Sequence, residues 1–165
     1  MRRTPTLSRL FISALAIWAL DFLTKSWALE NFSSSPRKIL GDFLQFTLLR
    51  NPGAAFSMAT GFTIVFTSLA LAVMGFILFY APRITSRGWA LVAGLVLGGV
   101  LGNLTDRIFR EPGFFYGHVI DWIEIPNFPV FNVADIAIST AAVIAGILTI
   151  RNVRPIATEK STEYE

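Results

Sequence analysis

The sequence predicts a four-helix membrane bundle, and three observations carry this prediction. The chain is strongly apolar, with a mean hydropathy of +0.58 and 53% hydrophobic residues among its 165. It contains four long apolar runs, and about 20 apolar residues suffice to cross the hydrocarbon of a bilayer as a helix. The runs leave little chain for a soluble domain. We therefore expect one integral-membrane domain over residues 1–154 and a polar tail over 155–165.

The apolar runs define the predicted spans in chain order. They cover residues 10–29, 62–81, 89–108 and 130–150. Asp21 and Lys25 interrupt the first span, and Asp135 lies in the second turn of the fourth. The first run is too long for the apolar core of a typical signal peptide, and it carries no clear small-residue cleavage site. We interpret it as a retained membrane helix.

The basic residues predict the orientation of the bundle. The short loop at 82–88 holds Arg83 and Arg87 and no acid, and the chain begins with an Arg-rich segment. Short cytoplasmic loops carry an excess of Lys and Arg, so we expect both termini in the cytoplasm. The sequence pI near 9.7 then indicates contact with anionic membrane lipids and not binding of nucleic acid.

The two outer connections differ in pattern. After a polar turn at 33–37, residues 42–50 alternate in part and favour β-structure, so we expect strands in the first outer loop. The second connection, 111–129, contains aromatic residues of the kind found at membrane interfaces. These are Phe114, Phe115, Tyr116, Trp122 and Phe128. We expect this connection to lie at the membrane surface.

This topology brings the unusual polar residues to one face of the membrane. The first span runs outward, so Asp21 and Lys25 lie in its outer half. The second span follows the turn at 51–56, the third ends with 98–107, and the fourth begins with 131–135. A charge at the bilayer centre costs at least about 2.5–3.5 kcal/mol. Acids at membrane depth therefore indicate a function or a specific partner.

Composition narrows the chemistry that such a site can perform. The chain has no cysteine and a single histidine, His118, which excludes a thiol nucleophile and a histidine-rich zinc site. Two aspartates that share a proton can activate a water and protonate a carbonyl, with neither metal nor cofactor. Asp121 and Asp135 are the candidates for this pair. The alternative is that Asp135 only caps its helix or pairs within the bundle while Asp121 is a solvated loop acid.

The other charged residues near these acids have structural interpretations as well. Asp21 and Lys25 are spaced i, i+4 and face each other on one helix surface, which favours a structural ion pair. Asp106 and Arg107 could latch neighbouring helices together. Arg107 could equally hold backbone carbonyls of a bound substrate, and both interpretations remain open.

Amides and small residues stand beside the same helix ends. Asn51, Asn103 and Asn132 can hydrogen-bond an extended peptide, or they can satisfy backbone groups at helix termini. The glycines at 98, 99 and 102, and the small residues at 53–55, allow close approach of a helix or of a lipid chain. For the asparagines and for the small residues alike, a role at the substrate and a purely structural role both remain open.

Five short blocks resemble the motifs of bacterial lipoprotein signal peptidases, also called signal peptidase II. The blocks are Asp21-Phe-Leu-Thr-Lys25, Asn51-Pro-Gly-Ala-Ala-Phe56, Gly98-Gly-Val-Leu-Gly-Asn-Leu-Thr-Asp-Arg107, Val119-Ile-Asp121 and Phe131-Asn-Val-Ala-Asp135. They extend from the first span to the last. The first block alone is weakly specific, whereas the five blocks in this order and topology are highly specific.

The resemblance implies an aspartyl endopeptidase that removes the signal peptide from diacylglyceryl-modified prolipoproteins, just before the lipidated cysteine. The implied fold is mainly α, a four-transmembrane-helix bundle with a small extracytoplasmic β-sheet, the β-cradle. Asp121 and Asp135 match the catalytic pair of the family. The matches to positions near its substrate are Asn51, Gly53, Asn103, Arg107 and Asn132. The residues to which we assign a structural polar role are Asp21, Lys25 and Asp106.

The implied partners are lipid-modified prolipoproteins and membrane lipids, with no nucleic acid. We expect a monomer in the bacterial inner membrane, with its active site at the extracytoplasmic face and no cofactor. A small proton-coupled transporter is the rival interpretation, and it predicts acids spread across the membrane depth and internal repeats. A non-catalytic scaffold is a third, and it gives no reason for two acids at neighbouring helix entrances.

Overall fold

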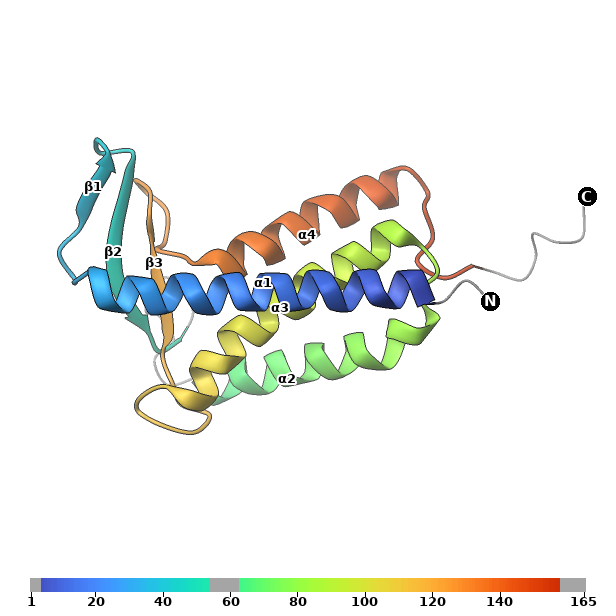
Figure 1. Ribbon diagram of the computed structural model, residues 1–165, viewed down its shortest axis with the longest axis horizontal. Helices are drawn as coiled ribbons and strands as arrows, with labels where there is room; N and C mark the ends of the chain where they lie inside the picture. The colour runs from blue at the N-terminus through green and yellow to red at the C-terminus, as the bar shows by residue number, and fades with distance from the viewer. Residues whose placement is uncertain (1–3, 54–62, 158–165) are drawn as a thin grey trace, which may run out of the picture.

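The computed structural model describes residues 4–53 and 63–157 (Figure 1). In chain order the elements are α1 (Thr4–Asn31), β1 (Arg37–Leu40), β2 (Leu44–Asn51), α2 (Thr63–Tyr80), the 3-10 turn η3 (Ala81–Arg83), α3 (Arg87–Phe109), β3 (Val119–Glu124) and α4 (Val133–Ile150). Within the described residues, α1, α2 with η3, α3 and α4 are long and apolar enough to cross a membrane. The three strands lie together at one end of the helices (Figure 1). The predicted fold class, a helical bundle with a small sheet, is confirmed.

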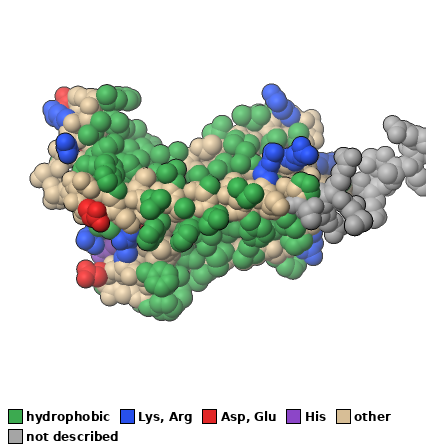
Figure 2. All heavy atoms as spheres, in the orientation of Figure 1, with side chains coloured by type: hydrophobic (Ala, Val, Ile, Leu, Met, Phe, Trp, Pro, Cys, Tyr) green, Lys and Arg blue, Asp and Glu red, His purple; other side chains and the backbone are tan. Residues whose placement is uncertain are grey.

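Helix α3 is the central element of the bundle, and it packs against α1, α2 and α4. The outer surfaces of these three helices carry large apolar side chains that are exposed, such as Leu15, Phe76 and Val143. Figure 2 shows the apolar surface running along the bundle between its two polar ends. An apolar belt of this extent is typical of a surface that contacts lipid.

Glycines in α3 allow the neighbouring helices to approach closely. A Cβ atom on Gly98 would lie 2.6 Å from the backbone oxygen of Ala14 in α1, and one on Gly99 would lie 2.7 Å from that of Ala134 in α4. Both distances are shorter than real carbon contacts, so a larger residue would push the helices apart. Gly98 and Gly99 therefore serve helix packing, which was one of their two predicted roles.

The helices extend somewhat differently from the predicted spans. Helix α1 begins at Thr4 instead of residue 10, because a proline at the second position is compatible with a first helical turn. Helix α4 begins only at Val133, because Asn132 caps it. Some of the predicted features lie outside the described residues. These are residues 54–56 of the second block, the start of the second span at residue 62 and positions 158–165 of the tail.

The sheet is antiparallel, with β2 between β1 and β3. Strand β2 occupies most of the 42–50 stretch for which strands were expected, and this prediction is confirmed. The pairing of β2 with β3 sets Leu49 opposite Asp121 and Asn51 opposite Val119. The residue pattern alone did not predict β3. The sheet consequently joins the second and fourth sequence blocks, which lie about 70 residues apart in the chain.

The aromatic residues of the 111–129 connection divide into two groups. The exposed ones include Phe114, Tyr116 and Phe128. Trp122 is instead buried, with its ring centroid 5.6 Å from that of Trp27, 6.4 Å from that of Phe32 and 5.0 Å from that of Phe46. Trp122 therefore belongs to the interior of the protein, whereas the position of the connection at the membrane surface stays a prediction. This side chain packs β3 onto the end of α1 and positions the adjacent residue, Asp121.

Candidate active site

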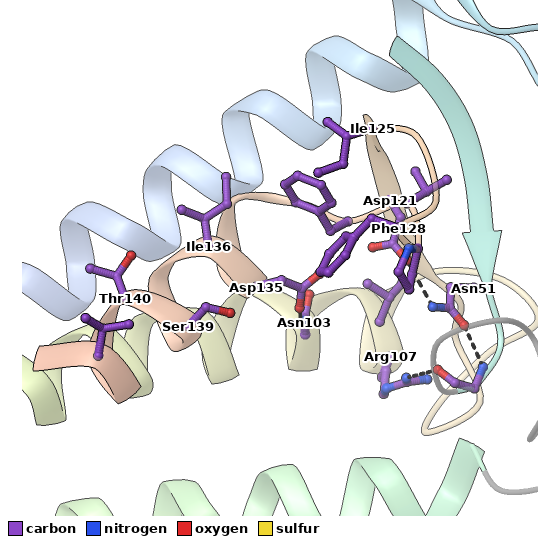
Figure 3. Close-up of a pocket in the computed structure, with 16 residues that line it drawn as sticks. Asn51, Asn103, Arg107, Asp121, Ile125, Phe128, Asp135, Ile136, Ser139 and Thr140 are labelled. Carbon is purple, nitrogen blue, oxygen red and sulfur yellow. Dashed lines mark hydrogen bonds between the residues drawn. The ribbon is translucent and has the colours of Figure 1, made fainter. Parts of the chain in front are cut away.

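A cavity of about 760 Å³ lies at the sheet end of the bundle (Figure 3). Its walls come from β2 and the turn after it, from α3, from β3 with the following loop, and from α4. The lining residues are Asn51, Gly53, Asn103, Arg107, Val119, Asp121, Ile125, Phe128, Pro129, Val130, Phe131, Asp135, Ile136, Ser139, Thr140 and Val143. Six of the seven residues predicted to be catalytic or near the substrate are in this set, and Asn132 is the exception.

Asp121 lies in β3 and is only 2% exposed. Each of its carboxylate oxygens accepts a hydrogen bond from a neutral amide. Nδ2 of Asn132 lies 2.6 Å from Oδ1, and Nδ2 of Asn51 lies 3.0 Å from Oδ2. Burial raises the pKa of Asp121 to about 7, with the charge of Asp135 acting in the same direction and the two amides opposing it. Asp121 is therefore not a solvated loop acid, which was the alternative interpretation.

Asp135 lies in the first turn of α4, where it forms a capping box with Asn132. The side-chain oxygen of Asn132 accepts from the backbone N–H of Asp135 at 3.0 Å, and Oδ2 of Asp135 accepts from the backbone N–H of Asn132 at 3.2 Å. The other carboxylate oxygen, Oδ1, accepts from Nδ2 of Asn103 at 3.1 Å. Asp135 is half-buried and lines the cavity, so it caps its helix and also faces the site.

Asn132 joins the two aspartates. Its side chain bonds to Asp121, while its backbone N–H and side-chain oxygen bond to Asp135. The residue is fully buried behind the cavity wall. The structure therefore brings Asp121 and Asp135 to one site although they come from a strand and from a helix.

Arg107 projects from α3 towards the same cavity (Figure 3). Its guanidinium donates to the backbone oxygens of Gly53 at 3.3 Å and of Pro52 and Gly117 at 3.5 Å. These contacts tie the turn after β2 to the connection before β3. The predicted latch is visible in this geometry, although the partners of Arg107 are loop carbonyls instead of a second helix.

A cluster of four charged residues lies next to the cavity, and we call Asp21, Lys25, Asp106 and Arg110 the ion cluster. The first three are buried, and Arg110 is partly exposed. Nζ of Lys25 lies 2.7 Å from Oδ2 of Asp21 and 2.8 Å from Oδ2 of Asp106. Arg110 pairs with the other oxygen of Asp106. The ion cluster therefore joins α1 to α3, with Lys25 only 1% exposed.

Each acid of the ion cluster also holds a backbone group next to a cavity aspartate. Oδ1 of Asp21 accepts from the backbone N–H of Ala134 at 2.9 Å. Oδ2 of Asp106 accepts from the backbone N–H of Ile120 at 3.1 Å. Ala134 precedes Asp135 and Ile120 precedes Asp121, so the ion cluster supports both aspartates through the main chain.

One wall of the cavity, formed by α4, was not predicted from the sequence. Ile136, Ser139 and Thr140 continue the surface that begins with Asp135 (Figure 3), and Val143 lines the cavity as well. Residues spaced three and four apart lie on one face of a helix, and this spacing from Asp135 is the signal that could have identified them. The cavity thus extends from the aspartates along a helix that is long and apolar enough to cross a membrane.

The arrangement suits acid–base chemistry. Among the described residues, no group of three or more His, Cys, Asp or Glu side chains could hold a metal ion. Both aspartates are partnered by N–H donors, and a carboxyl pair of this kind can exchange protons with a water and with a carbonyl. If one carboxyl carries a proton and the other is ionised, the first can act as the acid and the second as the base.

Comparison with known proteins identifies the family. A family model described as signal peptidase (SPase) II matches residues 13–151. The lipoprotein signal peptidase of Leifsonia xyli is 46% identical over 146 residues, which are 87% of this chain and 68% of that protein. That of Rhodococcus jostii is 44% identical over 155 residues, or 93% of this chain and 78% of that protein.

Solved structures support the fold. A bacterial membrane enzyme solved by the in meso method at 2.3 Å resolution matches with a TM-score of 0.75 and 21% identity, over 94% of both chains. A second, at 1.9 Å resolution, matches with a TM-score of 0.74 and 21% identity, over 87% of this chain and 93% of that one. With the family model and the relatives each matching most of its length, this chain belongs to the signal peptidase II family of multi-pass membrane proteases.

Proposed function

We propose that this protein is an aspartic endopeptidase that removes signal peptides from lipid-modified prolipoproteins, just before the lipidated cysteine. The observation that carries the proposal is the pair Asp121 and Asp135, which line one cavity and are held by neutral amides. The relatives are named lipoprotein signal peptidases, which supports prolipoproteins as the substrate class. One chain supplies both aspartates, so a monomer suffices.

The proposed reaction begins with Asp121 protonated and Asp135 ionised. Asp135 takes a proton from a water whose oxygen attacks the carbonyl carbon of the scissile bond, while Asp121 donates its proton to the carbonyl oxygen. The C–N bond of the tetrahedral diol then breaks. Asp135 gives its proton to the leaving nitrogen, and a diol hydroxyl returns a proton to Asp121. The pKa of about 7 for Asp121 supports its role as the acid.

The α4 wall of the cavity suits a substrate that is anchored in lipid. Ile136, which directly follows Asp135, and Val143, about two turns further along α4, give this wall apolar character. Burial of acyl chains contributes about 0.8 kcal/mol per CH₂ group. A substrate with such an anchor would reach the site by lateral diffusion, and the apolar wall would favour lipidated precursors over unmodified ones.

We infer that the site faces the extracytoplasmic side of the bacterial inner membrane. The loop with Arg83 and Arg87 lies at the end of the bundle opposite the sheet, as do the start of α1 and the end of α4 (Figure 1). This end carries no described acid, whereas Figure 2 shows acidic and basic side chains together at the sheet end. The positive-inside rule assigns an end of the first kind to the cytoplasm.

A cleavage assay with two forms of one precursor tests the proposal. The purified protein is incubated with a diacylglyceryl-modified prolipoprotein and with its unlipidated form, and the products are weighed by mass spectrometry. We expect the mass loss of the signal peptide from the lipidated form only, and no loss with Asp135→Asn. Equal cleavage of both forms would refute the lipid requirement, and cleavage by the variant would refute the aspartate mechanism.

A further inference from the structure

The amide of Asn103 connects the ion cluster to the cavity. We propose that Asn103 is a positioning residue for Asp135, and that Lys25 sets the direction of its amide so that the NH₂ group faces the aspartate. This inference rests on the proposed function, because it describes how Asp135 is prepared to take a proton from water. It replaces direct substrate contact as the main role of Asn103.

The contacts of Asn103 determine which way its amide points. An asparagine side chain can be turned by 180° with little change of shape, so only its partners decide where its oxygen and nitrogen lie. Nζ of Lys25 lies 2.9 Å from Oδ1 of Asn103. An ammonium group can only donate, so the amide oxygen must face Lys25. Nδ2 of Asn103 is then left to donate to Asp135, at 3.1 Å.

Lys25 is itself held in place by three neighbouring oxygen atoms. Its ammonium has three N–H groups, and there are three acceptors around it, on Asp21 at 2.7 Å, on Asp106 at 2.8 Å and on Asn103 at 2.9 Å. The side chain is only 1% exposed, so water does not compete for these bonds. A buried ammonium with three oxygen atoms around it fixes the direction of the Asn103 amide more firmly than a solvated one would.

The same arrangement occurs at the two other asparagines of the site, with a different donor. The side-chain oxygen of Asn51 accepts from the backbone N–H of Gly53 at 3.0 Å, and that of Asn132 accepts from the backbone N–H of Asp135. Both therefore turn their NH₂ groups towards Asp121. The amides that serve Asp121 are set by the main chain, whereas the oxygen of the amide that serves Asp135 accepts from the charged side chain of Lys25 at 2.9 Å and from Nδ2 of Asn132 at 3.2 Å.

An N–H donor aimed at a carboxylate oxygen stabilises the ionised form, which is the form that a base requires. The charged groups that face Asp135 are Arg107 from α3, Asp121 from β3 and, through Asn103, Lys25 from α1. If Asn103 presented an oxygen instead, two acceptors would oppose each other. The proton that the proposed reaction needs on Asp121 would then be drawn to the contact between residue 103 and Asp135.

The variant Asn103→Asp replaces the NH₂ group that faces Asp135 with an oxygen, with almost no change of shape. Its carboxylate can still accept from Lys25 and from Nδ2 of Asn132, which now lies 3.2 Å from the Asn103 oxygen, so the bundle keeps these bonds. We expect kcat for the lipidated precursor to fall by about 100-fold, with KM unchanged and the acidic limb of the pH profile moved to higher pH. Asn31→Asp adds the same charge at the exposed end of α1 and should leave the kinetics unchanged.

A second pair of variants tests the part played by Lys25. Asn103→Ala removes the donor without adding a charge, and Lys25→Gln removes the group that sets the amide. If Lys25 acts through Asn103, Lys25→Gln should lower kcat by less in the Asn103→Ala background than in the unaltered protein, because only the part of its effect that passes through the main-chain bonds of Asp21 and Asp106 remains there, when rates are corrected for the folded fraction. Additive losses in the double variant would overturn the role of Lys25.

The remaining outcomes separate this inference from the proposed function. A raised KM with unchanged kcat in Asn103→Asp or Asn103→Ala would mean that Asn103 contacts the substrate, which overturns the inference. An unchanged kcat and pH profile would mean that the amide direction has no effect, which also overturns it. If the unaltered protein does not cleave the lipidated precursor, the proposed function itself is wrong.

Discussion

The ion cluster and the cavity aspartates are neighbours, yet their acids are stabilised in opposite ways. In the ion cluster, Asp21 and Asp106 contact the ammonium of Lys25, and Arg110 adds a second cation. In the cavity, Asp121 and Asp135 accept hydrogen bonds only from neutral amides and backbone N–H groups. Asp121 and Asp135 line the cavity, whereas Asp21 and Asp106 do not.

This difference explains how four acids near membrane depth can serve two purposes. An acid matched by a buried cation holds helices together, and removing either partner leaves an uncompensated charge. Asp121 is instead held by neutral donors beside another acid, and burial raises its pKa to about 7, so it can gain or lose a proton at moderate pH. The four acids also lie close to one another. A proton-coupled transporter would instead need a series of acids across the membrane, so this grouping argues against it.

The largest effect is expected from changing the cavity aspartates. Asp121→Asn and Asp135→Asn should each lower the single-turnover rate of cleavage by at least about 1000-fold, because an amide can neither take the proton of water nor supply the shared one. Thermal unfolding should stay close to that of the unaltered protein. Asp42→Asn, at an exposed acid of the β1–β2 turn, is the matched control. Near-normal turnover in either cavity variant would show that the pair is not catalytic.

Breaking the ion cluster should have its main effect on folding. Asp21→Asn leaves Lys25 with one carboxylate partner fewer at a fully buried position, and the loss of one member of a buried ion pair costs on the order of 3–5 kcal/mol. We expect lower yield and a lower unfolding temperature in detergent, measured beside Asp42→Asn. A variant that is fully stable but inactive would instead move Asp21 into the reaction.

The pH dependence of activity should reflect the raised pKa of Asp121. The group must be protonated to act as an acid, so the single-turnover rate should fall by about tenfold per pH unit above its pKa of about 7. Product release can hide this limb in steady-state rates, which is why single turnovers are needed. A rate that stays constant up to about pH 9 would exclude Asp121 as the acid.

The same shift has a consequence for stability. Between the ordinary pKa of 3.8 and about 7, Asp121 keeps its proton when folded and loses it when unfolded. Unfolding therefore releases a proton in this range, so the contribution of Asp121 to stability should decrease as the pH rises from about 4 to about 7 and then level off. In Asp121→Asn this part of the pH dependence should be absent from thermal unfolding curves.

The smallest effect is expected from removing metal ions. Because the aspartates are partnered by amides and no metal-binding group of three occurs in the described residues, cleavage should be unchanged after strong chelation. Rates before and after chelation, with and without added divalent ions, give the comparison. A loss that a divalent ion restores would point to a metal held by carboxylates.

The sequence predicted the helices and the meeting of the polar blocks well, for a physical reason. Long apolar runs have few alternatives to a membrane helix, and helix direction then decides which residues share a face. Asp21 and Lys25 could be paired from their spacing alone. The bonds of Asp106 to Lys25 and to Ile120 could not, because they join segments that only the folded bundle brings together.

Strand β3 was less predictable than the helices. It is a short stretch of six residues, most of them buried, so it shows no alternation of polar and apolar positions. Its pairing with β2 is long-range, and this pairing decides that Asp121 faces Asn51. The individual roles of the asparagines depend on which donors surround them. That information appears only once the side chains are in place.

The protonation state of Asp121 tests the contrast between the two regions most directly. Isotope-edited infrared spectra of carbon-labelled aspartate would be recorded from about pH 5 to about pH 9 for the unaltered protein, Asp121→Asn and the control Asp42→Asn. We predict a protonated carboxyl band that disappears as the pH passes about 7, and that is missing in Asp121→Asn but present in Asp42→Asn. A band that persists in Asp121→Asn, or that is absent from the unaltered protein at pH values well below 7, would contradict the account.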